Sequence, residues 1–386
     1  MYDLIIVGTR VAGSATAMLM ARRGLSVLAV DRAAFPSDTL STHQVQVPGI
    51  ALLERWGLLD ELIAAGTPAT QRVRFDPGHV VLEGSFPAYE GVDALFSPRR
   101  RLLDAVLVDA ARAAGAEVRE RFSVEELTFD DGRVTGIRGR DDGGRSVIER
   151  APLVIGADGR HSLVARAVRP VAYREQPPLT FGYYTYWSGV PLEGGEIYGR
   201  GRRLVGAWPT NDDLVVTYVV GPIADFRAFR SDIEGNVLAA LDQAGDLGAR
   251  IRAGERVERL RGTADTPNRF RTPHGPGWAL VGDSGLVLDP ATGQGIGFAL
   301  RDAQLLADAA DAGFTTDALA GYERRRNDAA SDMYDFTVGL ASFAPPDPEG
   351  QRMLESLAGR QEAIDRFLGV LTGAVPFAEM FAPTPA

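Results

Sequence analysis

Three glycine-rich turns stand out in this sequence of 386 residues, and each directly follows a short run of apolar residues. They span residues 8–13, 156–159 and 282–295. Glycine permits tight backbone turns, and the free N–H groups at the start of a following helix bind anions such as phosphate. Three such turns after predicted strands are hard to explain by packing alone, so they favour a bound nucleotide cofactor.

The first turn, Gly8-Thr9-Arg10-Val11-Ala12-Gly13, lies between an apolar strand at residues 3–7 and a helical run at residues 14–23. A second apolar strand at residues 26–30 completes a βαβ unit and ends at Asp31. This order of elements is typical of a dinucleotide-binding fingerprint. A βαβ turn that only packs its helix against its strand remains the alternative.

Each position of this turn has a physical role in that interpretation. Gly8 allows the turn, Gly13 lets helix and strand pack closely, and Asp31 can accept a hydrogen bond from a ribose hydroxyl. Arg10 replaces the middle glycine of the usual pattern. Its guanidinium can instead donate a charge-assisted hydrogen bond to the pyrophosphate or ribose, which is a hypothesis.

The other two turns also follow predicted buried strands. Gly156-Ala157-Asp158-Gly159 comes after residues 152–155, and Gly282-Asp283 comes after residues 278–281. Asp289-Pro290-Ala291-Thr292-Gly293-Gln294-Gly295 follows closely and leads into a helix predicted from about Gly295 to Ala310.

With these motifs the sequence resembles the FAD-dependent aromatic hydroxylase superfamily, which also contains the flavin halogenases and the geranylgeranyl reductases. The resemblance covers roughly residues 3–310. It implies FAD as the resident cofactor, with NADH or NADPH visiting transiently as co-substrate. It also implies an α/β fold: a discontinuous Rossmann-like FAD-binding domain, an inserted, mainly antiparallel β-sheet substrate domain, and C-terminal helices.

The resemblance assigns roles to several motif residues. Asp158 would lie between the flavin and the nicotinamide path, Asp283 at the ribityl chain, and Pro290 with Gly293 at the helix terminus beneath the flavin pyrimidine. Arg100, three residues before Leu103, would contact a flavin phosphate or the ribityl chain. Arg166 stands one position later than the corresponding family arginine, so its nicotinamide-linked role is not carried over. The expected cofactor-binding residues are Gly8, Arg10, Ala12, Gly13, Asp31, Arg32, Arg100, Val124, Asp158, Asp283, Pro290, Gly293, Gln294, Gly295 and Ile296.

The positions of these motifs predict a chain divided into three parts. Residues 1–70, 101–170 and 271–345 would form the FAD-binding domain, and residues 71–100 and 171–270 the substrate domain. Residues 346–386 would form a C-terminal helical segment with a disordered tail that ends in Pro383-Thr384-Pro385.

Aromatic residues gather in the predicted substrate domain, on strands at residues 181–187 and around Trp208. Side chains alternate between the faces of a strand, so one face can line a pocket for a planar substrate. We take Tyr184, Tyr186 and Trp208 as candidate substrate contacts, although packing in a core is the commoner role for such rings. The candidate catalytic residue is His43, in the loop that the resemblance places beside the flavin ring; it can also cap the helix that starts near Pro48.

Composition narrows the chemistry further. The chain has no cysteine, which excludes disulfides, thiolate metal sites and a cysteine nucleophile. It also has no lysine, so halogenation that depends on an active-site lysine, as in the flavin halogenases, is not expected. The net charge of −10 argues against a nucleic-acid partner. We expect a small-molecule substrate, no metal site, no membrane span and a cytoplasmic location; the oligomeric state is left open.

The leading hypothesis is an NAD(P)H-dependent FAD monooxygenase that hydroxylates an aromatic or polyketide-like small molecule, in secondary metabolism. The first alternative is an FAD-dependent reductase or dehydrogenase that acts on a C=C bond, like the geranylgeranyl reductases. The second, of another class, is a flavin-binding protein without turnover.

Overall fold

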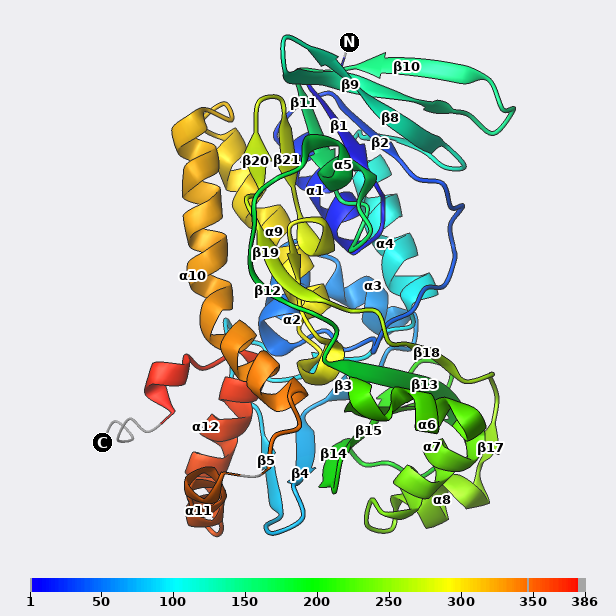
Figure 1. The fold of residues 1–386 in the computed structure, drawn as a ribbon, viewed down its shortest axis with the longest axis vertical. Coiled ribbons are helices and arrows are strands. Elements are labelled where there is room, and N and C mark those ends of the chain that lie inside the picture. Colours follow the sequence, from blue (N-terminus) through cyan, green and yellow to red (C-terminus); the bar gives the residue numbers. More distant parts are fainter. Residues whose placement is uncertain (1, 346, 381–386) are drawn as a thin grey trace.

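A computed structural model describes residues 2–345 and 347–380. Figure 1 shows a sheet flanked by long helices in the upper part of the molecule and a second large sheet in the lower part. A small three-stranded sheet lies at the top, next to the N-terminus. The chain therefore folds around two main sheets, each with its own covering helices.

The upper sheet has six strands in the order β20-β21-β11-β1-β2-β7. Its central strands are short apolar runs that are buried along their whole length, as expected for parallel strands covered on both faces. β1 pairs in parallel with both β11 and β2, and β21 pairs in parallel with β11. The strand bounds are β1 Leu4–Val7, β2 Val27–Val30, β7 Glu117–Arg119, β11 Leu153–Gly156, β20 His274–Gly275 and β21 Trp278–Leu280.

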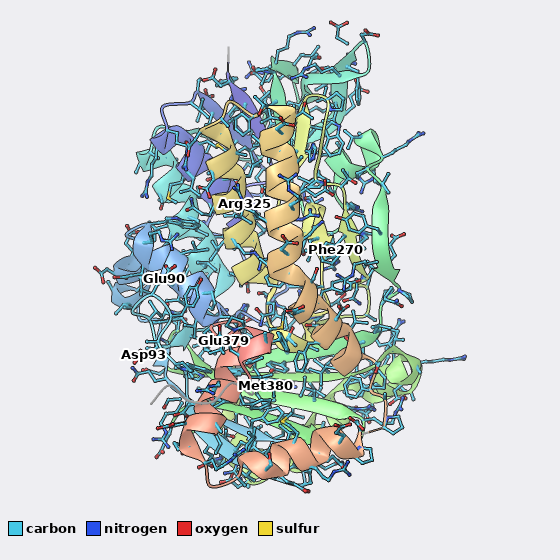
Figure 2. All side chains as sticks on the ribbon, turned by 90° about the vertical axis from the view of Figure 1, so that its left-hand side faces the viewer. Glu90, Asp93, Phe270, Arg325, Glu379 and Met380 are labelled. Carbon is cyan, nitrogen blue, oxygen red and sulfur yellow. The ribbon has the colours of Figure 1, made fainter. Side chains whose placement is uncertain are left out.

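Helices cover one face of this sheet, with α1 packed between α4 and α9, and α10 against α9. Figure 2 shows α10 running lengthwise over this side of the molecule. The other face packs against a three-stranded antiparallel sheet, β10-β9-β8, and a short helix, α5. The bounds are α1 Val11–Arg22, α4 Arg100–Ala113, α5 Leu163–Val168, α9 Gly295–Ala310, α10 Thr316–Ala341, β8 Ser123–Asp130, β9 Arg133–Arg140 and β10 Ser146–Arg150.

The lower sheet has eight strands in the order β17-β13-β16-β15-β14-β4-β5, with β18 beside β13. Its pairs are antiparallel except for β14 and β4. The bounds are β4 Arg72–Asp76, β5 Leu82–Ser85, β13 Thr180–Ser188, β14 Gly195–Arg200, β15 Arg203–Thr210, β16 Leu214–Pro222, β17 Glu255–Arg256 and β18 Arg261–Thr263.

The two faces of the lower sheet serve different neighbours. Phe181, Val205 and Val219 face three helices, α6 Phe226–Phe229, α7 Ile233–Asp242 and α8 Leu247–Ala253, and form a separate core with them. Tyr186 and Trp208 point the other way and belong to the main core, which continues into the upper part of the molecule. Aromatic residues therefore occupy both faces, as the sequence predicts.

The remaining elements join these two layers. β12 Ala172–Gln176 pairs with β19 Asn268–Arg271, which pairs with β22 Leu286–Val287, and β3 Ala69–Thr70 pairs with β6 Leu95–Phe96. The other helices are α2 Val47–Arg55, α3 Leu59–Ala64, α11 Pro348–Leu357 and α12 Gln361–Thr372. Figure 2 shows α11 and α12 below α10, at the end of the molecule that holds the lower sheet, and α12 packs on β5.

Most of the predicted elements are confirmed, including the helix at residues 295–310 and the strands at residues 181–187 and 214–220. The first helix was wrongly placed: it begins at Val11, inside the glycine turn, and not at Ser14. Residues 172–176 pair with β19 and not with the eight-stranded sheet, so the proposed boundary at residue 171 stays a prediction. The predicted tail at residues 383–385 lies outside the described residues. No helix within residues 2–345 and 347–380 is long and apolar enough to cross a membrane.

Candidate functional site

The topology brings the three glycine turns to the same edge of the upper sheet. β1, β11 and β21 are adjacent and parallel, so the turns that follow them start at neighbouring carboxyl ends. Backbone hydrogen bonds continue past the strands: Ala157 N donates to Val7 O at 2.8 Å, and Val281 N to Gly156 O at 3.0 Å. We call this region, formed by residues 8–13, 156–159 and 282–295, the cofactor edge.

The first turn is closely packed. A Cβ added to Gly13 would lie 1.8 Å from the carbonyl oxygen of Gly8, and one added to Gly8 would lie 2.5 Å from the carbonyl oxygen of Ala157. Gly8 also has a φ of +96°, which favours glycine. Ala12, which is buried, lies against Gly282 of the third turn. These glycines are required by the fold itself, whether or not a ligand binds.

Two arginines at the cofactor edge share one buried carboxylate. Asp104 on α4 has a fully buried side chain and accepts hydrogen bonds from Arg10 at 2.6 Å and from Arg100 at 2.9 to 3.1 Å. Arg10 also donates to the backbone and the hydroxyl of Ser37. The Arg10 guanidinium, which the sequence suggested could reach a pyrophosphate, is therefore already bound to protein groups. Asp104 positions it, and the sequence assigned no role to Asp104.

Asp31 follows β2, the strand beside β1, and therefore lies next to the first turn of the cofactor edge. The Asp31 carboxylate accepts hydrogen bonds from Thr9 N at 2.7 Å and Ala33 N at 2.8 Å, which leaves lone pairs for a ligand hydroxyl. Arg32 is exposed beside it. Val124 lies on β8, partly buried, and the same segment approaches Asp31 because Phe122 N donates to the Asp31 carbonyl.

The two acidic residues of the second and third turns have different surroundings. Asp158 is held in place by protein groups, because its carboxylate accepts hydrogen bonds from Leu163 N, Val164 N and the hydroxyl of Ser284. Asp283 has no hydrogen-bond partner among the described residues, yet it faces the positive charges of Arg100 and Arg160. Burial raises the pKa of Asp283, and these two arginines counteract the rise. Asp283 is thus the acidic group left free to bind hydroxyls.

The third turn is open toward its ligand side. Pro290 begins a short 3-10 segment, and Gly293 has a left-handed φ of +65°. A Cβ added to Gly295 or Gly297 would meet nothing within 4 Å. The first turn of α9, which includes the buried Ile296, receives no side-chain cap, so its backbone N–H groups can stabilise a negative charge.

These observations fit a flavin dinucleotide. Open space beside Gly295 and Gly297 can receive a planar ring, the free carboxylate of Asp283 can accept hydrogen bonds from ribityl hydroxyls, and the glycine turn at α1 can receive a pyrophosphate. The contacts of the fifteen expected cofactor residues with FAD remain predictions.

His43 is buried between the cofactor edge and the lower sheet. Its Nε2 is hydrogen-bonded to the hydroxyl of Tyr186, its ring stacks on Tyr186 with centroids 5.5 Å apart, and Tyr184 meets it edge-on. Burial lowers the pKa of His43 well below its ordinary value, and the charges of Arg100, Arg99 and Arg261 lower it further. His43 is therefore neutral, and its φ of +67° is unusual for a residue other than glycine.

A group of charges surrounds this histidine. The guanidinium of Arg99 lies 3.9 Å from the ring centre of Tyr186 and forms an ion pair with Glu258. Arg261 forms ion pairs with Asp38 at 3.4 Å and with Glu258 at 3.7 Å. The pair between Asp38 and Arg261 ties the loop that carries His43 to β18. Arg99 was not predicted from the sequence, where its only signal is the run of three arginines at residues 99–101.

Buried His43 Nδ1 has no hydrogen-bond partner among the described residues, and the buried donors Gln44 Nε2 and Trp208 Nε1 share one neighbouring acceptor, the Tyr218 hydroxyl. The hydroxyl of Tyr218, on β16, lies beside both Gln44 and Trp208. Gln44 also packs on Gly293, since its Oε1 would lie 2.2 Å from a Cβ added there. Gln44 and Tyr218 were not predicted as site residues, because only the fold places them between the third turn and the aromatic face.

Comparison with known proteins agrees with this geometry. Residues 1–190 match the family described as FAD binding domain. A 12-dehydrotetracycline 5-monooxygenase/anhydrotetracycline 6-monooxygenase from Streptomyces rimosus is 28% identical over 395 residues, covering 97% of this chain and 76% of that protein. The chain belongs to the FAD-dependent aromatic hydroxylase superfamily. It is an FAD-dependent enzyme, and its relatives include halogenases and geranylgeranyl reductases as well as monooxygenases.

Two halogenating proteins are also similar. A 1H-pyrrole-2-carbonyl-[peptidyl-carrier protein] brominase from Pseudoalteromonas luteoviolacea is 24% identical over 327 residues, covering 80% of this chain and 77% of that protein. The structure of the myxobacterial chondrochloren halogenase superposes with a TM-score of 0.80 and 21% identity, covering 100% of this chain and 98% of that one. The second likeness shows a shared fold.

Proposed function

We propose that this enzyme is an NAD(P)H-dependent monooxygenase that hydroxylates an aromatic or polyketide-like small molecule bearing oxygen substituents. One observation carries the proposal: residues 43–46 contact the third glycine turn on one side and the aromatic face of the lower sheet on the other. A substrate held against Tyr184, Tyr186 and Trp208 would therefore lie next to the flavin.

The polar groups at this junction indicate what the substrate presents. Gln44 Nε2 and Trp208 Nε1 can only donate hydrogen bonds, both are buried, and the acceptor they share is the Tyr218 hydroxyl. A substrate oxygen placed beside Tyr218 would give these donors a second acceptor. Phenolic or keto oxygens would satisfy these donors, and the surrounding rings would bind the planar carbon skeleton.

His43 is the proposed catalytic residue. A neutral imidazole has one donor and one acceptor nitrogen, and Nε2 is already used by Tyr186. Nδ1 remains to hydrogen-bond a substrate oxygen or to exchange a proton with it. Burial and the charges of Arg100, Arg99 and Arg261 keep the imidazole uncharged at neutral pH and make it a weak base, so its proposed role is to hold a substrate oxygen by a hydrogen bond and to accept its proton transiently.

In the overall reaction NAD(P)H supplies two electrons, one atom of dioxygen enters the substrate as a hydroxyl group, and the other leaves as water. Bound FAD would carry the electrons from NAD(P)H to dioxygen. Halogenation is not proposed, despite the halogenating relatives, because the chain contains no lysine.

The test is to reduce the FAD-loaded protein with NADH or NADPH without oxygen, and then to add isotopically labelled dioxygen and a panel of phenolic and polyketide-like compounds. Mass spectrometry should detect one labelled oxygen atom in a product. Oxygen-independent NAD(P)H oxidation coupled to loss of a substrate C=C bond would instead show a reductase. Bound FAD that NAD(P)H does not reduce would indicate a flavin-binding protein without turnover.

His43→Asn tests the catalytic assignment, with His161→Asn as its control. We expect His43→Asn to lower kcat/KM by about 100-fold, the usual contribution of a general acid or base. The His161 side chain is exposed and pairs with the exposed Asp265, just after β18, so its variant should keep normal kinetics. A His43 variant as active as His161→Asn would refute the catalytic role.

A further inference from the structure

The third glycine turn is fixed by side chains from elements far away in the sequence. Asp289, at its start, accepts a hydrogen bond from the Thr180 hydroxyl at 2.8 Å, where β13 begins. Gln46, beside the N-terminus of α2, donates to the Thr292 carbonyl at 3.2 Å. The turn is thus tied both to the lower sheet and to the segment that carries His43.

The C-terminal helices hold the same turn from the opposite side. The hydroxyls of Thr292 and Thr337 on α10 are 2.8 Å apart, and Thr337 in turn donates to Met333 O at 2.7 Å. Gln294 Nε2 donates to Leu371 O at 2.9 Å. Leu371 lies in the last turn of α12, where carbonyl groups lack partners within the helix. Gln294 therefore satisfies one of the free carbonyls of α12.

Gln294 has an unusual part in this arrangement because it is the N-cap residue of α9. An N-cap side chain commonly accepts a hydrogen bond from the first turn of its own helix. The buried Gln294 side chain reaches away to α12 and makes no such cap. The contact holds the turn in place and leaves the N–H groups of residues 295–297 without a side-chain partner, next to the open space at Gly295 and Gly297.

We propose that Gln294 is a positioning residue through which α12 sets the preference of the site for reduced over oxidised FAD. The proposal rests on the placement of the flavin at the third turn. Reduction adds negative charge to the flavin, and backbone N–H groups at a helix N-terminus stabilise such charge. Their alignment depends on how rigidly residue 294 is held, and α12 supplies that support from a segment more than 60 residues later in the chain.

The test compares Gln294→Met, which keeps the length of the side chain but cannot donate, with Gln304→Met on the same helix. Gln304 also has two side-chain hydrogen bonds, to Trp56 and Asp308, but lies away from the turn. Thr337→Val, which removes the hydroxyl beside Thr292, is the second variant in case Gln294→Met does not fold. For each holoenzyme, one measures the midpoint potential of bound FAD, the Kd of oxidised FAD and amide hydrogen exchange at residues 290–298.

We expect Gln294→Met to weaken the binding of reduced FAD about tenfold more than that of oxidised FAD, which lowers the potential by about 30 mV for a two-electron couple. Exchange at residues 290–298 should accelerate, Thr337→Val should shift the potential in the same direction, and Gln304→Met should change neither quantity. Equal weakening of both FAD forms, or an unchanged potential, would overturn the proposal. A wild-type protein that does not hold FAD at this turn would instead refute the cofactor placement.

Discussion

The first and third glycine turns lie at the same edge of one sheet, but their glycines serve different purposes. In the first turn the added methyl of Gly13 would collide with backbone, and Arg10 and Arg100 share the single carboxylate of Asp104. In the third turn Gly295 and Gly297 face open space, and contacts with β13, α2, α10 and α12 hold the loop. The glycines of the first turn are required by its close packing, whereas those of the third turn leave open space for a bound molecule.

A glycine motif can therefore reflect either close packing that the fold requires or space that a ligand needs. Collision of a hypothetical Cβ with backbone marks a glycine that the fold requires. Open space around such a Cβ marks a glycine that leaves room for a bound molecule. The following predictions test this distinction.

The largest effect should come from Asp104→Asn, which leaves Arg10 and Arg100 without their shared counter-charge. Removing one partner of a buried ion pair typically costs 3–5 kcal/mol, and we expect the free energy of unfolding in urea to fall by about 4 kcal/mol. Asp109→Asn, which breaks an exposed pair with Arg112 on the same helix, should cost less than about 1 kcal/mol. Similar losses in the two variants would show that the first turn does not depend on Asp104.

Gly13→Ala and Gly295→Ala compare the two turns directly. Gly13→Ala forces backbone apart and should lower the stability of the FAD-free protein by about 3 kcal/mol or more. Gly295→Ala should change that stability by less than about 1 kcal/mol, yet raise the Kd for FAD about tenfold, because its methyl enters the flavin space. Urea unfolding and flavin fluorescence titration measure these quantities. Unchanged FAD affinity in Gly295→Ala would contradict the interpretation of the open glycines.

A smaller, pH-dependent effect concerns Asp302, a buried residue on α9 whose carboxylate accepts a hydrogen bond from Gly282 N at 3.1 Å. Burial raises the pKa of Asp302 to about 6. The unfolded chain therefore releases this proton at a lower pH, and the stability of the folded state falls as the pH rises from about 4 to about 6. Asp302→Asn should gain stability relative to the wild type over this range, by at most about 3 kcal/mol.

Asp311→Asn supplies the control of opposite sign. The side-chain hydrogen bond from Arg23 holds the pKa of Asp311 below its ordinary value, so its contribution to stability is present at neutral pH and is lost as the pH falls through the lowered pKa. Asp311→Asn should therefore lose stability relative to the wild type as the pH rises. If the difference in the free energy of unfolding between variant and wild type changed with pH in the same direction for both variants, the assignment of Asp302 would be contradicted.

Local signals in the sequence predicted the strands, the three turns and the helix after the third one. Gly8 is recognisable because it directly follows an apolar run, and Gly293 and Gly295 are recognisable because they resemble a family motif together with Pro290. The residues that hold the site in place could not be predicted in this way. Asp104, Gln44 and Leu371 acquire their roles only when the fold joins elements that are distant in the sequence. The sequence also suggested a phosphate contact for Arg10, since nothing local shows that Asp104 binds its guanidinium.

A crystal structure of the protein with FAD shows directly whether the three glycine turns bind the cofactor together. We predict one FAD along the cofactor edge, with its adenosine near Asp31, its ribityl chain within hydrogen-bond distance of Asp283 and its isoalloxazine ring over Gly295 and Gly297. FAD bound elsewhere, or with its ring away from the N-terminus of α9, would contradict the account of how the three turns act together.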